Sequence, residues 1–246
     1  MDKIMVTGMV VSVMPVGEYD KRVVLLTKER GKISAFSRGS RRQNSAMLGS
    51  TEPFVFGRFW LIEGRSAYTL VQAEIDSYFM ELRQNLDAAY YGFYFLEFAA
   101  YYAGENEDCT QMLRLLVQTM RILCKKVINN KLVRRIFELK LMTINGEYPQ
   151  VFECVKCGRS APFAGFSPSL SGFVCPMCKR MGGTVIEADA STVYTMQYII
   201  SSSIEKLYTF TVSDQVLSEL SVIMDRHMAR FIDKKFNALA MLELLY

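Results

Sequence analysis

Residues 4–37 read IMVTGMVVSVMPVGEYDKRVVLLTKERGKISAFS and contain the first three of five apolar, β-branched runs. Turn residues separate these runs at Pro15–Gly17 and at Glu29–Gly31. Short runs of this composition between turn residues are typical of β-strands. The five predicted strands are Ile4–Met14, Arg22–Thr27, Lys32–Ser37, Phe54–Glu63 and Ala67–Ile75. Five short strands in fewer than 80 residues favour a small closed barrel. An OB fold is the first choice, and an SH3-like barrel fits the periodicity nearly as well.

After Ser77 the hydrophobic period changes from that of strands to that of helices. The predicted helices are Leu82–Ala103, Cys109–Ile128 and Leu132–Ile144. Asn145-Gly146 then forms a clear helix stop. Helical character returns near Thr192, and Ser213 has the residue type of an N-cap for an amphipathic helix. The apolar face of that helix is expected to comprise Val216, Leu220, Ile223, Met224 and His227.

Four of the six cysteines form two closely spaced pairs, Cys154-x2-Cys157 and, after 17 residues, Cys175-x2-Cys178. Two residues between thiolates let one tight turn direct both sulfurs at the same ion, and two such turns complete a tetrahedron. We therefore predict one structural Zn²⁺ per chain, with no open position for a substrate. A pair of free-cysteine motifs or redox dithiols is the alternative. The other two cysteines lie on predicted helices and are read as buried thiols.

Residues 150–183 are too rich in Cys, Gly and Pro for a core helix, so they are read as an insertion in the helical part. The predicted fold class is α+β and multidomain: an N-terminal five-stranded OB-fold barrel, then an α-helical domain with an inserted four-cysteine zinc module. The expected boundaries are 1–80 for the barrel, 81–148 and 186–246 for the two parts of the helical domain, and 149–185 for the module.

Half of the 246 residues are hydrophobic and 22% are charged, which is enough apolar surface for a folded core. The first residues, MDKIMVTGMV, lack the regions of a signal peptide. The most apolar stretch, Ala88–Gly104, is 17 residues long and carries Glu97 in its middle. These features favour a buried helix over a membrane span and indicate a cytoplasmic protein.

Basic residues are concentrated in the predicted barrel. The whole chain has a net charge of +4, but residues 21–42 contain eight bases and one acid, a net charge of +7. The bases are Lys21, Arg22, Lys28, Arg30, Lys32, Arg38, Arg41 and Arg42. The aromatic residues that could accompany them are Phe36, Phe59, Trp60 and Tyr68. Such a surface can follow a phosphate backbone and stack exposed bases. A solvated face that only keeps the barrel soluble is the alternative.

A second basic run lies in the predicted helices. Residues 121–140 contain seven bases and one acid, Glu138, a net charge of +6. The bases are Arg121, Lys125, Lys126, Lys131, Arg134, Arg135 and Lys140. Arg134 and Arg135 stand beside apolar Ile136 and Phe137, a combination suited to an acidic peptide tail with an apolar end. Ordinary exposed positions for the bases and core positions for the apolar residues are the alternatives.

The sequence contains no recognisable catalytic motif. It has no GxxxxGK[ST] phosphate loop and no GxGxxG turn, so neither a nucleotide motor nor a dehydrogenase is indicated. The single histidine, His227, lies on the apolar side of a predicted helix and is read as a core or capping residue. The carboxylates form no pair suited to a two-metal site. We therefore expect a protein without catalytic activity.

Three stretches, Gly17–Asp20, Thr27–Gly39 and Thr69–Glu74, closely resemble the RecO family of recombination mediators. The order of the parts agrees with that family: a barrel, helices, a CxxC pair, the stretch FSPSLSGFVCPMC, returning helices, and a C-terminal segment FIDKKFNALAML. The resemblance covers essentially the full chain.

The resemblance implies a role in DNA repair and recombination. An N-terminal OB fold would bind single- and double-stranded DNA and anneal complementary strands. RecR would be a partner, and the C-terminal tail of single-stranded DNA-binding protein would be contacted so that RecA can be loaded onto coated DNA. The protein would then act at the nucleoid in the cytoplasm.

The family motif also suggests site residues. It implies DNA contacts at Lys21, Arg22, Lys32, Arg38, Arg41 and Arg42, and zinc ligands at Cys154, Cys157, Cys175 and Cys178. The helical candidates for a partner tail or second DNA site are Arg121, Lys125, Lys126, Lys131, Arg134 and Arg135. One departure is the loop at residues 43–48, QNSAML, which lacks the further Lys or Arg residues common in the family. We therefore expect the basic residues of the strands and of the helices to contribute more of the DNA affinity. The rival reading is a zinc-ribbon scaffold that binds RNA or protein.

Overall fold

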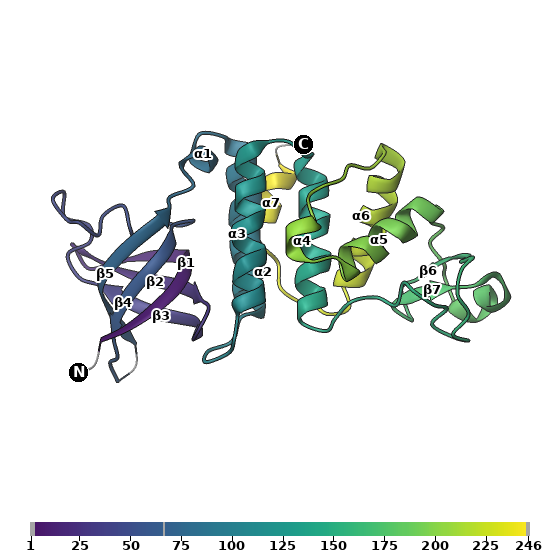
Figure 1. The fold of residues 1–246 in the computed structure, drawn as a ribbon, viewed down its shortest axis with the longest axis horizontal. Coiled ribbons are helices and arrows are strands. Elements are labelled where there is room, and N and C mark those ends of the chain that lie inside the picture. The colour runs from purple at the N-terminus through teal and green to yellow at the C-terminus, as the bar shows by residue number, and fades with distance from the viewer. Residues whose placement is uncertain (1–2, 66, 245–246) are drawn as a thin grey trace. The chain divides into compact units, whose positions relative to one another are not determined.

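The computed structural model describes residues 3–65 and 67–244. Its N-terminal part is a closed five-stranded barrel with the order β1-β2-β3-β5-β4 (Figure 1). The strands are β1 (Lys3–Val16), β2 (Asp20–Thr27), β3 (Gly31–Ser37), β4 (Phe56–Ile62) and β5 (Tyr68–Ser77). Each strand overlaps one of the five predicted from the sequence, so that prediction is confirmed.

Strand β1 closes the barrel because it is long enough to pair with two neighbours. Its first part, Lys3–Met9, pairs antiparallel with β4, and its second part, Gly8–Val16, pairs antiparallel with β2. A register shift between Val10 and Ser12 bends the strand between these partners. Strands β3 and β5 pair in parallel and complete the ring. This is the closed five-stranded arrangement expected of an OB fold.

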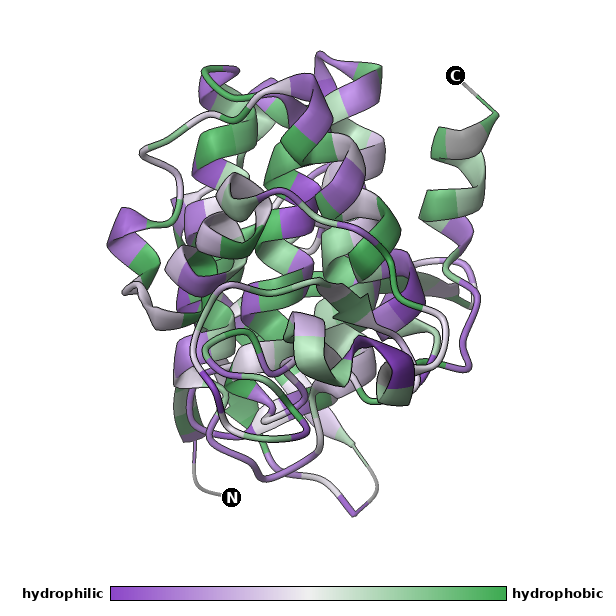
Figure 2. Cartoon of the chain, turned by 90° about the vertical axis from the view of Figure 1, so that its right-hand side faces the viewer, coloured by the Kyte–Doolittle hydropathy of each residue, from purple (hydrophilic) through white to green (hydrophobic). Residues whose placement is uncertain are grey.

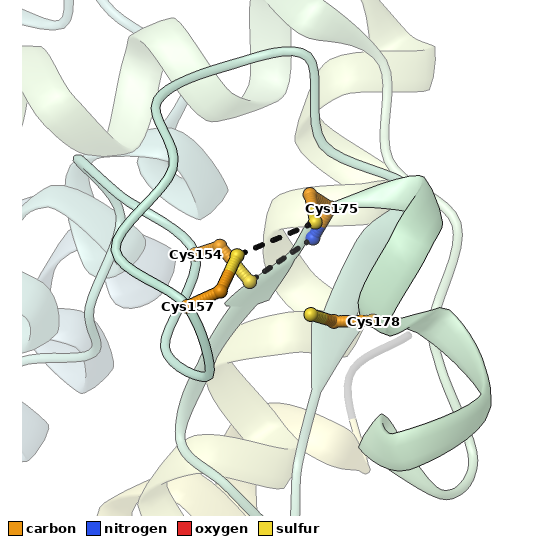
Figure 3. Close-up of side chains that lie close together, drawn as sticks. All are labelled: Cys154, Cys157, Cys175 and Cys178. Atoms are coloured by element: carbon orange, nitrogen blue, oxygen red, sulfur yellow. Dashed lines mark hydrogen bonds between the residues drawn. The ribbon is translucent and has the colours of Figure 1, made fainter.

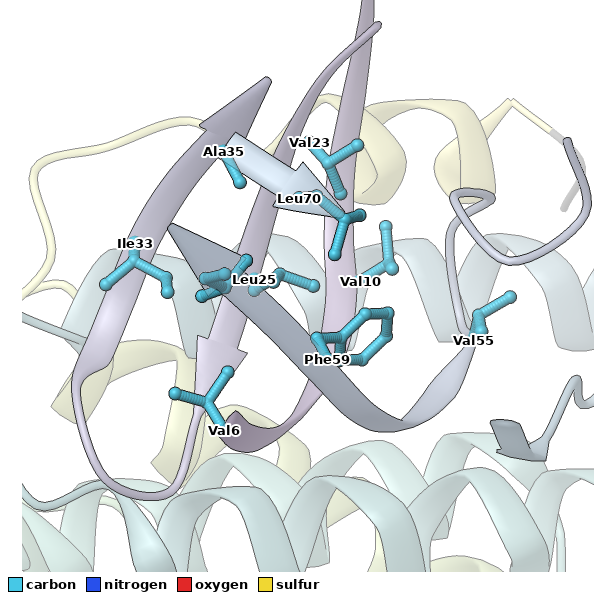
Figure 4. Close-up of a cluster of buried hydrophobic side chains, with 10 residues drawn as sticks. Val6, Val10, Val23, Leu25, Ile33, Ala35, Val55, Phe59 and Leu70 are labelled. Carbon is cyan, nitrogen blue, oxygen red and sulfur yellow. The ribbon is translucent and has the colours of Figure 1, made fainter. Parts of the chain in front are cut away.

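Alternate residues of the strands fill the barrel interior (Figure 4). Along β4, for example, Phe59 and Leu61 are buried while their neighbours are more exposed. This period of two arises because successive side chains of a strand point to opposite faces. The buried cluster comprises Val6, Val10, Val23, Leu25, Ile33, Ala35, Val55, Phe59, Leu61 and Leu70. The barrel interior is therefore a packed core, and residues that could bind a ligand lie on its outer face and in its loops.

Packing divides the chain into two compact units, Met1–Val127 with Phe236–Tyr246, and Ile128–Lys235. Besides the barrel, the first unit contains α1 (Met80–Arg83), α2 (Leu86–Tyr102), α3 (Thr110–Lys125) and α7 (Asn237–Glu243). The second contains α4 (Asn130–Ile144), β6 (Gly165–Ser167), β7 (Gly172–Val174), η1 (Pro176–Gly182), α5 (Ala190–Ser201), η2 (Ile204–Lys206) and α6 (Asp214–Met228). The boundaries expected from the sequence, 1–80, 81–148 with 186–246, and 149–185, stay a prediction.

The helix predicted at Leu82–Ala103 is two helices, α1 and α2. Asn85 between them has an extended backbone, and its side-chain oxygen accepts the Ala88 amide at 2.9 Å. An N-cap of this kind starts a new helix, which explains the break.

Helix α2 is buried, as its apolar sequence predicts. Tyr94 and Phe98 are fully buried, and Phe236 at the start of α7 packs edge-on against Tyr94 with ring centroids 5.5 Å apart. The C-terminal segment is thereby attached to the first unit. Among the described residues, no helix is both long and apolar enough to cross a membrane.

Helix α6 shows the predicted cap and the predicted face. The Ser213 hydroxyl accepts the Val216 amide at 3.3 Å, which makes Ser213 the N-cap. The five residues assigned to the apolar face, from Val216 to His227, are all buried. Figure 2 shows the same pattern more widely, with hydrophobic and hydrophilic residues sharing individual helices. The second unit is therefore held by amphipathic helices with the cysteine-rich segment between them in sequence.

Candidate metal centre and nucleic-acid interface

The two cysteine pairs meet in the second unit. The sulfur atoms of Cys154, Cys157, Cys175 and Cys178 all lie within 4.8 Å of one another (Figure 3). Cys157 is exposed and the other three are buried. Within the described part of the chain, these four cysteines are the one group of three or more His, Cys, Asp or Glu side chains close enough to bind a common metal ion. The prediction from the sequence that the two CxxC pairs come together is therefore confirmed.

Two tight turns present the cysteines to one another. In the first turn the Gly158 amide donates to the Cys154 carbonyl at 2.8 Å, and Gly158 adopts a positive φ of 70°. Glycine tolerates this left-handed conformation without strain. In the second turn the Cys178 amide donates to the Cys175 carbonyl at 3.0 Å. A bond from the Val155 amide to the Phe173 carbonyl, 2.9 Å long, joins the first turn to β7.

The distances fit a tetrahedral metal ion. Four sulfurs at about 2.3 Å from a central zinc would lie about 3.8 Å from one another. The sulfurs of Cys157 and Cys175 are 3.7 Å apart, and no pair exceeds 4.8 Å. The cluster is therefore compatible with a metal site, and a filled tetrahedron of thiolates would leave no position open for a substrate.

The electrostatics of the cluster also favour a cation. Burial opposes ionisation of Cys154, but amide hydrogen bonds, first from Cys175 and then from Lys156, lower the pKa of the Cys154 thiol to about 6. Burial and hydrogen bonds to the neighbouring thiols, first that of Cys157, raise the pKa of Cys178 to about 12. The thiolate of Cys154 therefore forms readily, whereas the raised pKa of Cys178 opposes a second thiolate beside it. A divalent cation at the centre would remove that opposition.

His227 links α6 to the cysteine-rich segment. Its Nε2 lies 2.7 Å from the Glu147 carbonyl oxygen and its Nδ1 lies 2.8 Å from the Ser171 hydroxyl. Because a carbonyl can only accept, Nε2 donates to it and Nδ1 accepts from Ser171. Burial lowers the pKa of His227, which favours this neutral form. The histidine is a core residue, as expected, and it fixes the turn that precedes β7.

On the barrel, four of the basic residues predicted to bind DNA are exposed: Arg22, Arg38, Arg41 and Arg42. Arg22 on β2 lies opposite Phe36 of β3 in the antiparallel register, and Phe36 is 38% exposed. The Arg22 guanidinium is oriented by the Ser34 hydroxyl, which is 3.0 Å from Nη2. An arginine and an aromatic ring thus lie side by side on the outer face.

A second such pair forms where the long loop begins. The Arg42 guanidinium stands 5.0 Å from the centre of the Tyr19 ring. Arg41 is attached to the same β1–β2 turn, because its amide donates to the Tyr19 carbonyl at 2.9 Å and Nη1 donates to the Gly17 carbonyl at 3.0 Å. These bonds keep both arginines at a defined place beside an exposed ring.

The aromatic residues were only partly identified from the sequence. Phe59 fills the barrel core and is wrong as a stacking candidate, because the alternation along β4 turns it inward. Trp60 and Tyr68 are half-buried, and the Lys3 ammonium stands 5.7 Å from the Trp60 ring. Tyr19 was missed, although it lies within one of the stretches that resemble the RecO family.

The two lysines among the predicted DNA contacts are engaged inside the first unit. Lys21 is buried, and its ammonium lies 2.5 Å from Glu52 Oε1 and 3.2 Å from the Thr51 hydroxyl. The Lys32 ammonium donates to the Ala100 carbonyl at 2.6 Å, in the last turn of α2. A cation there satisfies a free carbonyl and complements the helix dipole. Both lysines therefore hold the fold together, and we do not propose them as phosphate contacts.

The second basic run separates into exposed and buried residues. Arg121, Lys125 and Lys126 are exposed on or just after α3, and Lys131 is exposed at the start of α4. Lys140 is buried and donates to backbone carbonyls at the end of α5, the shortest bond being 2.6 Å to Ser202.

Arg134 and Arg135 belong to an internal ion-pair network. Arg134 Nε lies 2.7 Å from Glu138, and Arg135 Nη1 lies 2.9 Å from Glu138 and 2.7 Å from Asp225. Glu138 is fully buried, so it requires these partners. Ile136 and Phe137, which were expected to offer an apolar contact, are also fully buried. The hypothesis of a tail-binding site at this position is therefore corrected, because its charges and its apolar side chains serve the core.

Comparison with known proteins matches the barrel and the rest of the chain to two family models. Residues 1–79 match the model of the Recombination protein O N-terminal family, and residues 83–240 match that of the C-terminal family. A DNA repair protein RecO from Alkaliphilus metalliredigens is 31% identical over 225 residues, 91% of this chain and 92% of the relative. Another from Acetivibrio thermocellus is 27% identical over 247 residues, 100% of this chain and 98% of the relative. The chain therefore belongs to the recombination protein O family.

Proposed function

We propose that this protein is a non-catalytic recombination mediator in DNA repair. It binds single- and double-stranded DNA, anneals complementary strands and, with RecR, helps to load RecA onto DNA coated by single-stranded DNA-binding protein. The observation that carries the proposal is the set of exposed arginines paired with aromatic rings on the closed barrel of a RecO-family chain. Since its substrate is chromosomal DNA, the protein acts at the nucleoid in the cytoplasm.

The proposed DNA surface runs along β2, β3 and the β1–β2 turn. Guanidinium groups bind phosphates as planar hydrogen-bond donors, and exposed rings stack unpaired bases whatever their sequence. Arg22 beside Phe36 and Arg42 beside Tyr19 combine both functions. Arg38 and Arg41 add positive charge. Binding of this kind has little sequence preference and weakens with salt.

The proposed metal is one Zn²⁺ per chain, held by Cys154, Cys157, Cys175 and Cys178. Zinc is the metal most often bound by four thiolates in a closed tetrahedron, and its role in such sites is structural. The small core beside the cluster includes Val174 and a few half-buried apolar side chains. A core of this size does not stabilise a segment by itself, so the metal–thiolate bonds would contribute to folding free energy.

The proposed partner surface for the tail of single-stranded DNA-binding protein is the exposed basic group Arg121, Lys125 and Lys126. It replaces the position at Arg134 and Arg135, whose charges are engaged internally. Holding one strand at the barrel and a coated strand at this second basic group raises their effective concentration, which promotes annealing without bond chemistry.

Metal analysis tests the zinc proposal. We expect purified protein to contain about one zinc ion per chain, and Cys175→Ser to lose most of it and to unfold at a lower temperature, because metal binding and folding are coupled. Cys124→Ser, which changes a cysteine on α3, is the control and should keep its zinc. Little zinc in protein prepared without chelators, or full zinc in Cys175→Ser, would contradict the proposal. Iron in place of zinc would refute the identity of the metal.

Salt titrations test the DNA surface. Replacing Arg41 and Arg42 together with Ala should weaken binding to single-stranded DNA roughly tenfold at low salt and reduce the log–log salt slope by about 1.4, since each phosphate contact on a single strand contributes about 0.7. Lys125→Ala with Lys126→Ala removes the same charge from α3 and should leave this binding nearly unchanged. The assignment fails if the lysine pair, and not the arginine pair, lowers the slope.

An annealing assay tests the function as a whole. The protein should accelerate annealing of complementary strands without ATP, both bare and coated with single-stranded DNA-binding protein. Deleting the C-terminal tail of the coating protein should slow the coated reaction and leave the bare reaction unchanged. A strict ATP requirement, or no annealing at all, is incompatible with the proposed mechanism. Insensitivity to the tail would remove that partner contact, and binding of RNA or protein in place of DNA would favour a scaffold.

A further inference from the structure

The second unit contains a groove that the proposed barrel and metal functions do not use. It lies between α5 and residues 209–212, which precede α6, and has a volume of about 350 Å³. Three aromatic residues, three threonines and one valine line it: Tyr194, Tyr198, Phe210, Thr195, Thr209, Thr211 and Val212. A pocket of this size is in the range that binds small planar ligands.

One wall of the groove is rigid. The rings of Tyr198 and Phe210 pack edge-on with centroids 5.2 Å apart. The Tyr198 hydroxyl donates to the Lys206 carbonyl at 3.1 Å and lies 3.3 Å from the Thr209 hydroxyl. Hydrogen bonds and a ring contact therefore fix the orientation of Tyr198 before any ligand arrives, which lowers the entropic cost of binding.

The other aromatic wall is open to solvent. Tyr194 precedes Tyr198 by one helical turn, so both start from the same side of α5. Tyr194 is 67% exposed, which means that its ring contributes little to the core. Together with the other rings of the groove, Tyr194 therefore offers an aromatic face that a ligand can cover.

The chemistry of the groove selects its ligand. Apolar ring faces favour a flat, uncharged group. The hydroxyls of Tyr198, Thr195 and Thr209 already donate to backbone carbonyls, so their oxygens remain as acceptors for the polar edge of such a group. A nucleobase has both features in one planar group, whereas an aliphatic side chain has no polar edge and a phosphate has no apolar face. None of the residues that line the groove is charged, which suits the neutral part of a nucleotide. Lys206, which is exposed next to this wall, can meet the charged part.

We propose that this groove binds one unpaired base of single-stranded DNA, stacked on Tyr194. The inference rests on the proposed function, because it takes DNA as the ligand of the chain. It adds to the barrel a contact in the second unit that can distinguish between forms of DNA. Bases in a duplex are already stacked and paired, so the groove contributes to binding of single strands and not of duplexes.

The test is fluorescence anisotropy with a labelled thymidine oligonucleotide of about 20 nucleotides and a duplex of about the same length. Tyr194→Ala should weaken single-strand binding about tenfold and leave duplex binding within about twofold, as expected for the loss of one stacked base. Tyr194→Phe keeps the ring and should bind like the unaltered protein. Tyr148→Ala, an exposed tyrosine of the same unit outside the groove, is the matched control and should also bind normally.

The outcomes separate this inference from the proposed function. If the unaltered protein binds neither DNA, the proposed function falls and the groove assignment falls with it. If the unaltered protein binds DNA and Tyr194→Ala binds single strands equally well, only the groove assignment is overturned, and a protein partner becomes the alternative occupant. Equal losses for single strands and duplexes, or the same loss in Tyr194→Phe or Tyr148→Ala, also overturn it, because base stacking predicts none of these results.

Discussion

Removing a charged side chain from water is costly unless the charge is paired, and this constraint determines which basic residues of the chain can serve DNA. The fully buried Glu138 requires the guanidinium of Arg135. The ammonium groups of Lys32 and Lys140 bind the carbonyls at the ends of α2 and α5. Lys21 is paired with a glutamate of the long loop after β3. These cations stabilise the fold, and the exposed remainder is available to a polyanion.

The bases that remain exposed among the predicted DNA contacts are all arginines. Arg22, Arg38, Arg41 and Arg42 lie on the outer face of the barrel or in the loop that follows β3. Arginine suits this role because its planar guanidinium binds phosphates in a fixed geometry and also stacks on rings. The barrel is closed, with its hydrophobic residues inside, so it has no free strand edges. The arginines are therefore attached to a rigid support. Rigid placement is what allows a small number of contacts to hold a flexible strand.

Features governed by local spacing were predictable from the sequence, and features governed by distant partners were not. Alternating apolar residues predicted the strands, and the paired cysteines predicted a cluster that the structure brings together. The burial of Lys21 depends on Glu52, which is 31 positions away, and Arg135 pairs with the distant Asp225 in addition to its near neighbour Glu138. No pattern in a single sequence reveals such pairs. The Asn85 cap was a local signal, but the continuous apolar period around it obscured the break between α1 and α2.

The central claim is that exposure divides the basic residues into those that bind DNA and those that hold the fold. Arginine-specific chemical modification, followed by mass spectrometry with and without a single-stranded oligonucleotide, measures this division directly. The account predicts that Arg22, Arg38, Arg41 and Arg42 react in the free protein and become protected by DNA, while Arg135 reacts slowly in both states. Unchanged reactivity of those four arginines on a bound strand, with protection at other positions, would contradict it.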